Sequence, residues 1–345
     1  MSFGRILFDE KAFLANYELF RSRTTGQAGA VVKANAYGTG TSRAVRLLRE
    51  AGCHQFFVAV LEEAFEVRVN TPGVIFIFSG PKNAKEAETI ALEGFVPVLN
   101  TPSQIRLWKP YRHRACAIHV DTGMQRLGIG VEDCPDLSID SFNVRLVMTH
   151  LACADEPDHP ANRNQIQRFS AALNQFKGVP TSIGNSAGIL NGTEFQGDIV
   201  RPGIGLYGGN PWRSLPNPMQ AVVACEGTVL QVRTVRKGES VGYSAAYVAP
   251  DAIRVATVGL GYADGIPRSL SNRGECAFKG SRMPIIGLVS MDATQIECTH
   301  CPELNEGDYV QFFGDAISLD EFARNAGTIS YEILTGLGGR NRSIP

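Results

Sequence analysis

The chain has 345 residues, enough for two domains that each bury a substantial core. Its formal net charge of −1 gives no global attraction to nucleic acid or to an anionic membrane, so neither is expected as a partner. No apolar run approaches the roughly 20 residues that cross a bilayer. The first residues place charges where a signal peptide needs an apolar core, and we therefore expect a cytoplasmic protein.

The eight cysteines are scattered along the chain, and a reducing compartment would keep them as thiols. Cys298 and Cys301 form the one C-x-x-C spacing. No second pair supplies the other two ligands of a tetrahedral zinc site, so we interpret this spacing as incidental. Metal or redox use is the alternative, and no metal is expected.

The first two thirds of the chain alternate short apolar runs with amphipathic segments. The runs are rich in β-branched residues, which favours buried parallel strands. They lie at residues 30–34, 56–60, 74–78, 96–99, 115–120, 144–149, 181–184 and 199–207. Helical patterns lie between them at 42–51, 61–69, 84–92 and 161–176, whereas the connection at 128–141 has little helical pattern. Eight such units predict an α/β fold with a TIM-like (β/α)8 barrel, and a doubly wound open sheet is the alternative.

The pattern changes near residue 210, where several prolines interrupt it like a linker. Beyond them, strand-like runs at 226–232, 253–258, 283–287 and 309–313 alternate with glycine-containing and charged turns. A single clear helix is predicted at 318–325, with Ser318 as its N-cap and Glu321 three residues later. We predict a barrel domain over residues 1–220 and a mainly β domain over residues 221–345.

Residues 203–208 match the dinucleotide-binding pattern G-x-G-x-x-G. That pattern requires a first strand before it and a helix after it. Here it ends the eighth unit, and Pro211, Pro216 and Pro218 follow, so a nicotinamide or flavin site is rejected. The glycines could still present backbone N–H groups to a phosphate, as barrels often do after strands seven and eight.

Lys33 stands at the end of the first apolar run, within VVKANAYG at residues 31–38. A buried ammonium is costly unless it is paired or neutral, and a neutral lysine amine can attack a carbonyl carbon. The residues alone leave two interpretations open. One is a reactive lysine, and the other is a lysine that lies along an apolar surface with its charge in water.

The segment around Lys33 strongly resembles the cofactor-lysine motif of the alanine racemase family, whose members use pyridoxal phosphate (PLP). The resemblance continues in order along nearly the whole chain. Its further motifs are DTGMQRLG at 121–128, TH at 149–150, NSA at 185–187, VRPGI at 200–204, VGY at 241–243, GYADG at 261–265, VSMD at 289–292 and YEIL at 331–334. This ordered series is specific, and it implies that Lys33 binds PLP covalently.

The resemblance also implies which residues surround the cofactor. Hydroxyls and backbone donors, which suit a phosphate without adding charge, are expected at Tyr37, Ser186, Gly203, Ile204 and Tyr331. Arg201 is expected to face the pyridine nitrogen. Because arginine is always protonated and can only donate, it would keep that nitrogen unprotonated. In isolation, Ser186 would also fit a helix N-cap and Arg201 a strand-end salt bridge.

Racemisation needs acid–base groups on both faces of the substrate α-carbon. The resemblance implies Lys33 on one face and Tyr243 on the other. A free tyrosine titrates near 10, so Tyr243 needs a cationic or hydrogen-bonded neighbour, and His150 with Arg201 is expected to provide that chain beside the cofactor. Taken alone, Tyr243 also fits strand packing and His150 a satisfied core histidine.

The second base of this family comes from the partner subunit, so the resemblance implies a homodimer with composite active sites. Each site would take Tyr243 and Met291 from the other subunit. Met291 and Tyr262 are expected to contact the substrate. Arg126 is expected to contact the cofactor ring oxygen and the substrate carboxylate.

Two positions depart from the family pattern. His119 stands where many members have a lysine, often carbamylated, so another group or a bound anion must orient Arg126. Ser182 stands where many members have a histidine, which shortens the hydrogen-bond chain behind Arg201. Both positions lie behind the residues that contact the cofactor, so they bear on rate and pH optimum more than on reaction type.

The expected function is the interconversion of L-alanine and D-alanine, which supplies D-alanine for peptidoglycan. A racemase of the same fold that acts on serine or a larger amino acid is the first alternative. A PLP-binding regulatory protein without turnover is less consistent, because such barrel proteins typically lack a β domain. A decarboxylase of the related barrel fold does not fit the motifs that carry Tyr243 and Tyr331.

Overall fold

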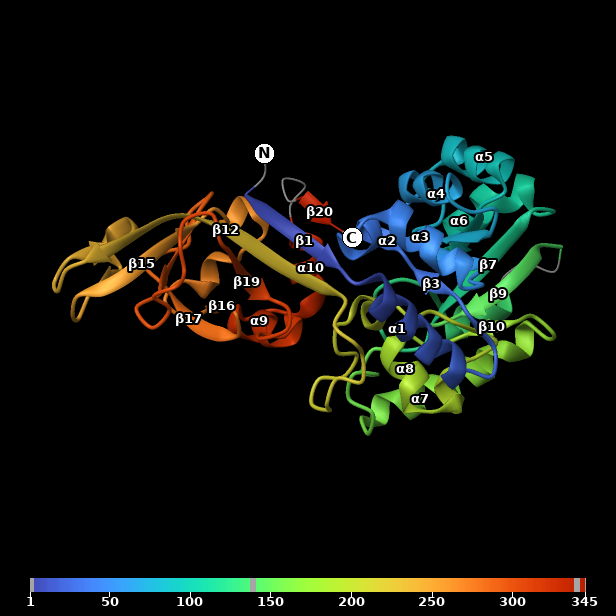
Figure 1. Cartoon of the computed structure of the whole chain (residues 1–345). Helices are drawn as coiled ribbons and strands as arrows, with labels where there is room; N and C mark the ends of the chain where they lie inside the picture. The colour runs from blue at the N-terminus through green and yellow to red at the C-terminus, as the bar shows by residue number, and fades with distance from the viewer. Residues whose placement is uncertain (1–2, 137–140, 338–341, 345) are drawn as a thin grey trace.

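The computed structural model describes residues 3–136, 141–337 and 342–344. The chain forms an α/β barrel and a mainly antiparallel β domain side by side (Figure 1). The long strand β12 (Val223–Val235) runs from their junction into the β domain. In the described part of the chain, no helix is long and apolar enough to span a membrane.

Within the described residues, eight short parallel strands line the barrel, if β2 and β3 are counted as one. They are β2 (Gln27–Ala28) with β3 (Ala30–Val31), β4 (Gln55–Val58), β5 (Val74–Ile77), β6 (Val96–Leu99), β7 (Ala115–Asp121), β9 (Asn143–Met148), β10 (Thr181–Ser182) and β11 (Ile199–Val200). Neighbours pair in parallel from β3 to β10. A parallel bridge joins Asn185 to Arg201, and β11 pairs with β2. The strands therefore form a ring, and the predicted barrel is confirmed over the open sheet.

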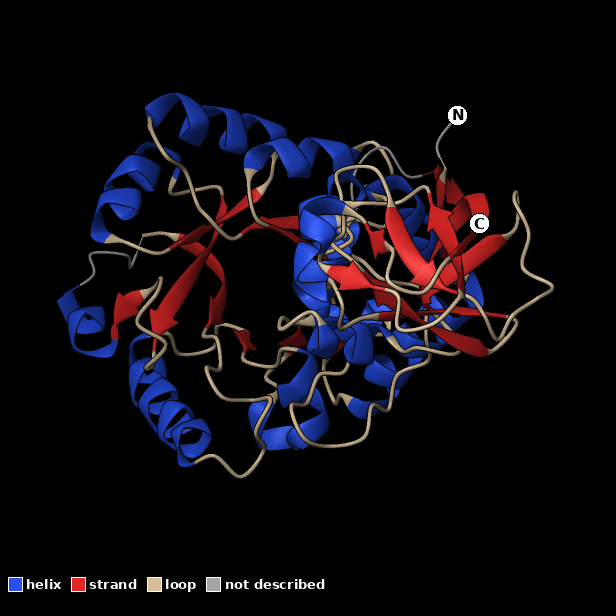
Figure 2. Cartoon of the chain, turned by 90° about the vertical axis from the view of Figure 1, so that its left-hand side faces the viewer, coloured by secondary structure: helices blue, strands red, loops and turns tan. Residues whose placement is uncertain are grey.

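Helices surround the strands of the barrel (Figure 2). They are α1 (Glu10–Arg23), α3 (Thr41–Glu50), α4 (Leu61–Arg68), α5 (Ala84–Glu93), α6 (Pro102–Trp108), α7 (Pro160–Ala172) and α8 (Ser186–Asn191). Several of these helices begin at a residue whose side chain caps them. In α5, the Asn83 side chain accepts from the N–H of Glu86. The connection with little helical pattern contains β8 (Ile129–Gly130) and a 3-10 turn (Val131–Asp136), while residues 137–140 lie outside the described residues.

The β domain is a sheet that curls back on itself. Its strand order is β15-β18-β17-β16-β19-β12-β1-β20, and β12 also pairs with β15. The strands after β12 are β13 (Ser240–Val241), β14 (Tyr247–Val248), β15 (Ile253–Val258), β16 (Glu275–Phe278), β17 (Ser281–Ile286), β18 (Thr294–Glu297), β19 (Tyr309–Phe313) and β20 (Arg342–Ile344). Helices α9 (Leu319–Asn325) and α10 (Ser330–Gly336) follow β19. Ser318 caps α9 by accepting from the N–H of Glu321, as predicted.

The first strand, β1 (Gly4–Phe8), belongs to this sheet although the barrel follows it in the chain. It pairs antiparallel with β12, from Gly4 opposite Gly227 to Phe8 opposite Val223. Its side chains are buried alternately, as expected for a strand with one face on a core. The sequence analysis did not predict β1, because a partner more than 200 residues away leaves no local signal.

Three predicted barrel strands are much shorter than expected. The seventh run, 181–184, is a strand only at Thr181–Ser182. The eighth run, 199–207, is a strand only as far as Val200. Pro202 has no N–H to continue the pairing, and a 3-10 turn follows at Ile204–Tyr207. The first run is a strand only as far as Val31, where the chain enters a left-handed turn.

A row of aromatic rings connects the two domains through the core. The ring of Phe8 in β1 lies 5.2 Å from that of Phe13, which lies 5.6 Å from that of Tyr207. Tyr207 stacks on Tyr37 with ring centres 4.6 Å apart. Tyr37 in turn lies 6.1 Å from the ring of Tyr331 in α10. The continuous core therefore leads from the β sheet to the end of the barrel strands.

Candidate active site

Lys33 begins a single left-handed turn at the carboxyl end of β3. The turn, α2 (Lys33–Tyr37), has φ values between 50° and 54° at its last four residues, which are alanines, an asparagine and a tyrosine. Residues with a Cβ avoid this conformation at a cost of about 1–2 kcal/mol each. Such a backbone persists only where its surroundings impose it, and it is a feature of functional sites.

The β domain packs directly against this turn. A Cβ added at Gly38 would lie 2.2 Å from the carbonyl oxygen of Leu334, so only glycine allows α10 to approach so closely. The Tyr37 ring is fixed between Tyr207 and Tyr331. The two domains therefore meet beside Lys33.

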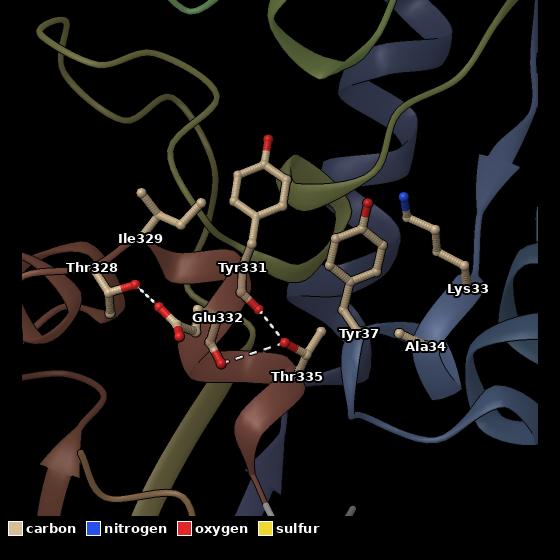
Figure 3. Close-up of a pocket in the computed structure, with 8 residues that line it drawn as sticks. All are labelled: Lys33, Ala34, Tyr37, Thr328, Ile329, Tyr331, Glu332 and Thr335. Carbon is tan, nitrogen blue, oxygen red and sulfur yellow. Dashed lines mark hydrogen bonds between the residues drawn. The ribbon is translucent and has the colours of Figure 1, made fainter. Parts of the chain in front are cut away.

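A cleft of about 660 Å³ opens at this junction, and we call it the Lys33 cleft. It is lined by Lys33, Ala34 and Tyr37 of the barrel and by Thr328, Ile329, Tyr331, Glu332 and Thr335 of the β domain. In Figure 3 the side chains of Lys33, Tyr37 and Tyr331 point in the same direction. A second cleft of about 840 Å³ includes His150 and shares Tyr331 with the first, so Tyr331 lines both.

Donors converge on Ser186 at the carboxyl ends of β10 and β11. The N–H groups of Gly203 and Gly205 donate to Ser186 Oγ at 2.8 and 3.3 Å. A Cβ added at Gly203 would lie 2.4 Å from Tyr37 Oη, so the tyrosine hydroxyl reaches the same place. The capping role considered for Ser186 falls instead to Asn185, whose side chain accepts from the N–H of Gly188. The structure thus brings Tyr37, Ser186 and Gly203 together, with Ile204 adjacent in the chain.

Tyr37, Ser186, Gly203 and Ile204 together form what we call the Ser186 cradle. Arg201 is buried behind it. Its guanidinium donates to Ser182 Oγ, to the carbonyl oxygens of Thr149 at 2.7 Å and Ile183 at 3.2 Å, and it lies 3.4 Å from His150 Nδ1. Burial lowers the pKa of Arg201 to about 9, which leaves the group protonated at neutral pH. Among the described residues no carboxylate pairs with it, so the alternative of a strand-end salt bridge does not hold.

Two histidines beside Arg201 are held neutral. Burial and then Arg201 push the pKa of His150 well below its ordinary value, and the same causes lower that of His119 to about 4. His119 Nδ1 lies 2.8 Å from Asn100 Oδ1. The Asn100 amide nitrogen is committed to two backbone carbonyl oxygens at 2.9 Å each. The Asn100 oxygen therefore accepts, Nδ1 carries the proton, and Nε2 of neutral His119 is left as an acceptor.

Arg126 follows β7 on a loop that Asp121 organises. The Asp121 carboxylate accepts from the N–H groups of three successive residues, Gly123, Met124 and Gln125, at 2.8–2.9 Å. Arg126 is exposed and makes no hydrogen bond or ion pair with the part of the chain that the structure describes. The loop therefore presents a free cation near the histidines, whose pKa values Arg126 helps to lower.

The other predicted site residues lie on the β domain with large exposed fractions. Tyr243 is 70% exposed, Met291 53% and Tyr262 45%. For the residues that the structure describes, neither Tyr243 nor Met291 lines the Lys33 cleft or the cleft that contains His150. The structure of one chain therefore does not bring the two proposed bases together.

Hydrogen bonds join the loops that carry these exposed residues. The N–H of Tyr262 donates to the carbonyl oxygen of Ser290 at 3.0 Å, which places Tyr262 beside Met291. Asn272 donates to the carbonyl oxygen of Ala246, three residues after Tyr243. It also accepts from the N–H of Gly287, at 2.6 Å. These hydrogen bonds therefore hold the loops that carry Tyr243, Met291 and Tyr262 together in one surface.

The site fits an anionic cofactor that carries a carbonyl group. Burial and Arg126 lower the pKa of Lys33, while Glu63 opposes them, so a neutral amine is accessible for a carbonyl carbon. The hydroxyl and glycine cradle around Ser186 fits a phosphate, and Arg201 offers a permanent donor to a ring nitrogen. A barrel with this lysine, cradle and arginine at its strand ends, followed by a β domain, defines the class of barrel-type PLP enzymes.

Comparisons with known proteins give the family. Models of the alanine racemase N-terminal and C-terminal domains match residues 8–211 and 222–344. The alanine racemase of Rhodospirillum rubrum is 44% identical over 93% of this chain and 89% of its own. The catabolic alanine racemase of Agrobacterium fabrum is 42% identical over 98% and 91%. The crystal structure of alanine racemase from Bartonella henselae with covalently bound pyridoxal phosphate has a TM-score of 0.95 and 35% identity, covering 100% of this chain and 99% of that one. The chain belongs to the alanine racemase family.

Sequence reasoning missed two side chains that support the site. Asn100 fixes the ring of His119, and Glu63 accepts from the N–H of Ala34 at 2.7 Å beside Lys33. Asn100 follows β6 directly, and Glu63 lies in the first turn of the helix after β4. Barrel enzymes build their sites at these carboxyl ends, so position alone was the available signal.

Proposed function

We propose that this protein is an alanine racemase, which interconverts L-alanine and D-alanine with PLP and two bases, Lys33 and Tyr243, and supplies D-alanine for peptidoglycan. The observation that carries the proposal is Lys33, whose amine has a lowered pKa at the cleft between the domains of a family member. Among the relatives are a biosynthetic and a catabolic alanine racemase from one organism, Agrobacterium fabrum.

The residues of the cleft would hold the cofactor in one orientation. When bound, PLP withdraws electrons from the substrate α-carbon and so makes its proton acidic. Lys33 would hold the cofactor covalently, and Tyr37, Ser186, Gly203, Ile204 and Tyr331 would hold its phosphate. Arg201, which only donates, would keep the ring nitrogen of the cofactor unprotonated, and the cofactor would then withdraw electrons less strongly. This moderation favours return of the proton over competing reactions.

Proton transfer is assigned to groups on the two faces of the α-carbon. The lowered pKa of Lys33 lets its neutral amine take a proton from one face. Tyr243 donates to the opposite face. His150 Nδ1 accepts from Arg201, so neutral His150 carries its proton on Nε2 and can donate to the Tyr243 oxygen.

A homodimer with composite sites is proposed because the site of a single chain lacks the second base. Tyr243, Met291 and Tyr262 are large exposed side chains on the β domain, which we assign to residues 221–345 together with β1, while the barrel carries Lys33. Large exposed side chains on supported loops are typical of an interface. Met291 and Tyr262 of the partner subunit would contact the substrate, and Arg126 would contact its carboxylate and the cofactor ring oxygen.

The proposed location is the cytoplasm. All eight cysteines are free thiols, and seven of them are buried. Thiols persist in a reducing compartment, which supports this location.

The proposal is tested by incubating the purified protein with single amino acids in deuterated water and following α-deuteration and chirality. Alanine should racemise faster than serine or larger amino acids, and the protein should show the visible absorption of lysine-bound PLP. Lys33→Ala should lose both. Unchanged absorption in Lys33→Ala would overturn the assignment of the lysine, and faster turnover of serine would favour the broader racemase.

A further inference from the structure

We infer that Glu63 is a positioning residue for Lys33: its carboxylate holds the left-handed turn that Lys33 begins and supplies the negative charge that faces the lysine. The inference rests on the proposed function in one respect, namely that Lys33 is the lysine that binds the cofactor. Glu63 itself would touch neither cofactor nor substrate.

The first observation is that one carboxylate joins the ends of two neighbouring barrel strands. Glu63 Oε1 accepts from the N–H of Ala34 at 2.7 Å. Glu63 Oε2 accepts from the N–H of Ala59 at 2.7 Å and from that of Val60 at 3.4 Å. Ala34 follows β3, and Ala59 follows β4, which pairs with β3. The position of the turn is thereby fixed relative to the adjacent strand.

The second observation is the strain of the turn that Glu63 holds. Four successive residues after Lys33 are left-handed without being glycine. The N–H of Ala36 donates to the carbonyl oxygen of Val32, whereas the N–H of Ala34, the residue next to Lys33, donates to Glu63. A charged acceptor makes a stronger hydrogen bond than a carbonyl oxygen does. Glu63 therefore stabilises the turn at the peptide unit that directs the Lys33 side chain.

The third observation is the charge around Lys33. Arg126, from the loop after β7, and burial both lower the pKa of Lys33, while Glu63, from α4, raises it. His150, after β9, is neutral, as are the phenols of Tyr37 and Tyr331 that complete the surroundings. Glu63 therefore limits how far the pKa of the lysine falls.

The neighbouring residue Glu62 provides a matched control. It lies one position earlier on α4 and is largely exposed, and within the described ranges its one ion pair is with Lys82, at 3.9 Å. Glu62→Gln and Glu63→Gln each remove one negative charge from the same helical turn. Only the second removes a carboxylate that contacts the turn at Lys33.

The first test measures hydrogen exchange of the Ala34 amide in the full-length holoenzyme. A glutamine has one acceptor oxygen, and its amide nitrogen would face another N–H, so Glu63→Gln should speed this exchange about three- to tenfold. Glu62→Gln should match the wild type. An unchanged rate in Glu63→Gln would overturn the positioning role.

The second test measures the pH profile of Lys33 acetylation by trace acetic anhydride in the full-length chain freed of cofactor. Because Glu63 raises the pKa of Lys33, Glu63→Gln should move the profile to lower pH, and Glu62→Gln should not. A role in folding alone would not move the profile. A profile that stays in place or moves to higher pH would overturn the charge role.

A third variant separates the two roles and guards against misfolding. Glu63→Asp keeps the charge but is too short to reach both strand ends, so Ala34 exchange should speed while the acetylation profile stays near that of the wild type. If the Ala34 amide exchanged as slowly in Glu63→Asp as in the wild type, the proposed link between the two strand ends would be contradicted. Failure of the proposed function would appear elsewhere, as unchanged absorption in Lys33→Ala, and would leave both results for Glu63 standing.

Discussion

The protonation states of individual residues determine which ligands the site can bind. His119 stands where many family members have a carbamylated lysine, and Asn100 fixes its protonated nitrogen. Neutral His119 can accept a hydrogen bond from a cation but adds no negative charge. Arg126 therefore keeps its full charge for an anionic ligand, which suits the carboxylate proposed as its partner.

His119 should make the stability of the protein depend on pH. Its pKa is about 4 in the folded chain against 6.5 when unfolded, so the unfolded chain binds the extra proton between these values. Stability is then fully present above pH 6.5 and is lost as pH falls toward 4, by roughly 3 kcal/mol. Urea unfolding at a series of pH values should show this loss, and His119→Gln should reduce it.

The exposed His113 is a suitable control for that measurement. His113→Gln should leave the dependence as it is in the wild type, because the His113 side chain is exposed and removing it takes away no buried group. If His119→Gln and the wild type lost stability equally between pH 6.5 and 4, His119 would not be held neutral by the fold.

At the scale of elements, α10 depends on a single carboxylate in α9. Asp320 accepts from Ser330 Oγ at the start of α10, from the N–H of Asn210 at 3.0 Å and from Asn217 Nδ2 at 2.9 Å. These partners belong to α10 and to the linker between the domains. Asp320 thus fixes the helix that carries Tyr331 to the segment that leaves the barrel.

Asp320→Ala should therefore loosen the cofactor site as well as the fold. Loss of three hydrogen bonds to a part-buried carboxylate should cost about 2 kcal/mol in the free energy of unfolding. The rate of PLP release should rise, because Tyr331 would no longer be held beside Tyr37. Thermal unfolding and loss of visible absorption measure both effects. Asp315→Ala, in an exposed loop, should change neither, and equal behaviour of the two variants would disprove the role of Asp320.

The elements that sequence predicted well are those with a local signal. Barrel strands are buried on both faces, so their apolar runs stand out, and β15 and β19 match their predicted ranges. The left-handed turn at Lys33 was not predictable, because its residues disfavour that conformation and distant contacts impose it. The short helix α10 was missed for want of an N-cap side chain.

The residues of the candidate site also fall into those that the sequence predicted and those that it did not. Motif residues such as Lys33, Ser186 and Arg201 were placed by resemblance, and the fold gathers them at one end of the barrel. Glu63 and Asn100 act on a backbone N–H and a ring nitrogen from other strand–helix units. Contacts of that kind depend on distances that no pattern along the chain encodes.

At the scale of the whole molecule, the proposed bases belong to different subunits, and this can be tested by complementation. Lys33→Ala and Tyr243→Phe should each be inactive alone, since loss of one acid–base group costs about 10²–10⁴-fold in rate. Tyr243→Phe should keep its cofactor, because the substitution removes only the phenol oxygen and Lys33 still holds the cofactor. Mixing the two variants under conditions of subunit exchange should restore one intact site per heterodimer. No recovery despite demonstrated exchange would mean that both bases come from one chain.

The pairing of β1 with β12 has a consequence for how the protein is made. The ribosome releases β1 more than 200 residues before β12, which at about 5–20 residues per second is a wait of roughly 10–40 s. During that time Ile6 and Phe8 lie on an unpaired edge, the kind of segment that sticks to other nascent chains. β1 can pair only after β12 has been made, so the start of the chain joins a sheet whose other strands all come from its last third. A nascent chain halted before residue 223 would therefore expose β1 without a strand to pair with, which makes it a substrate for chaperones.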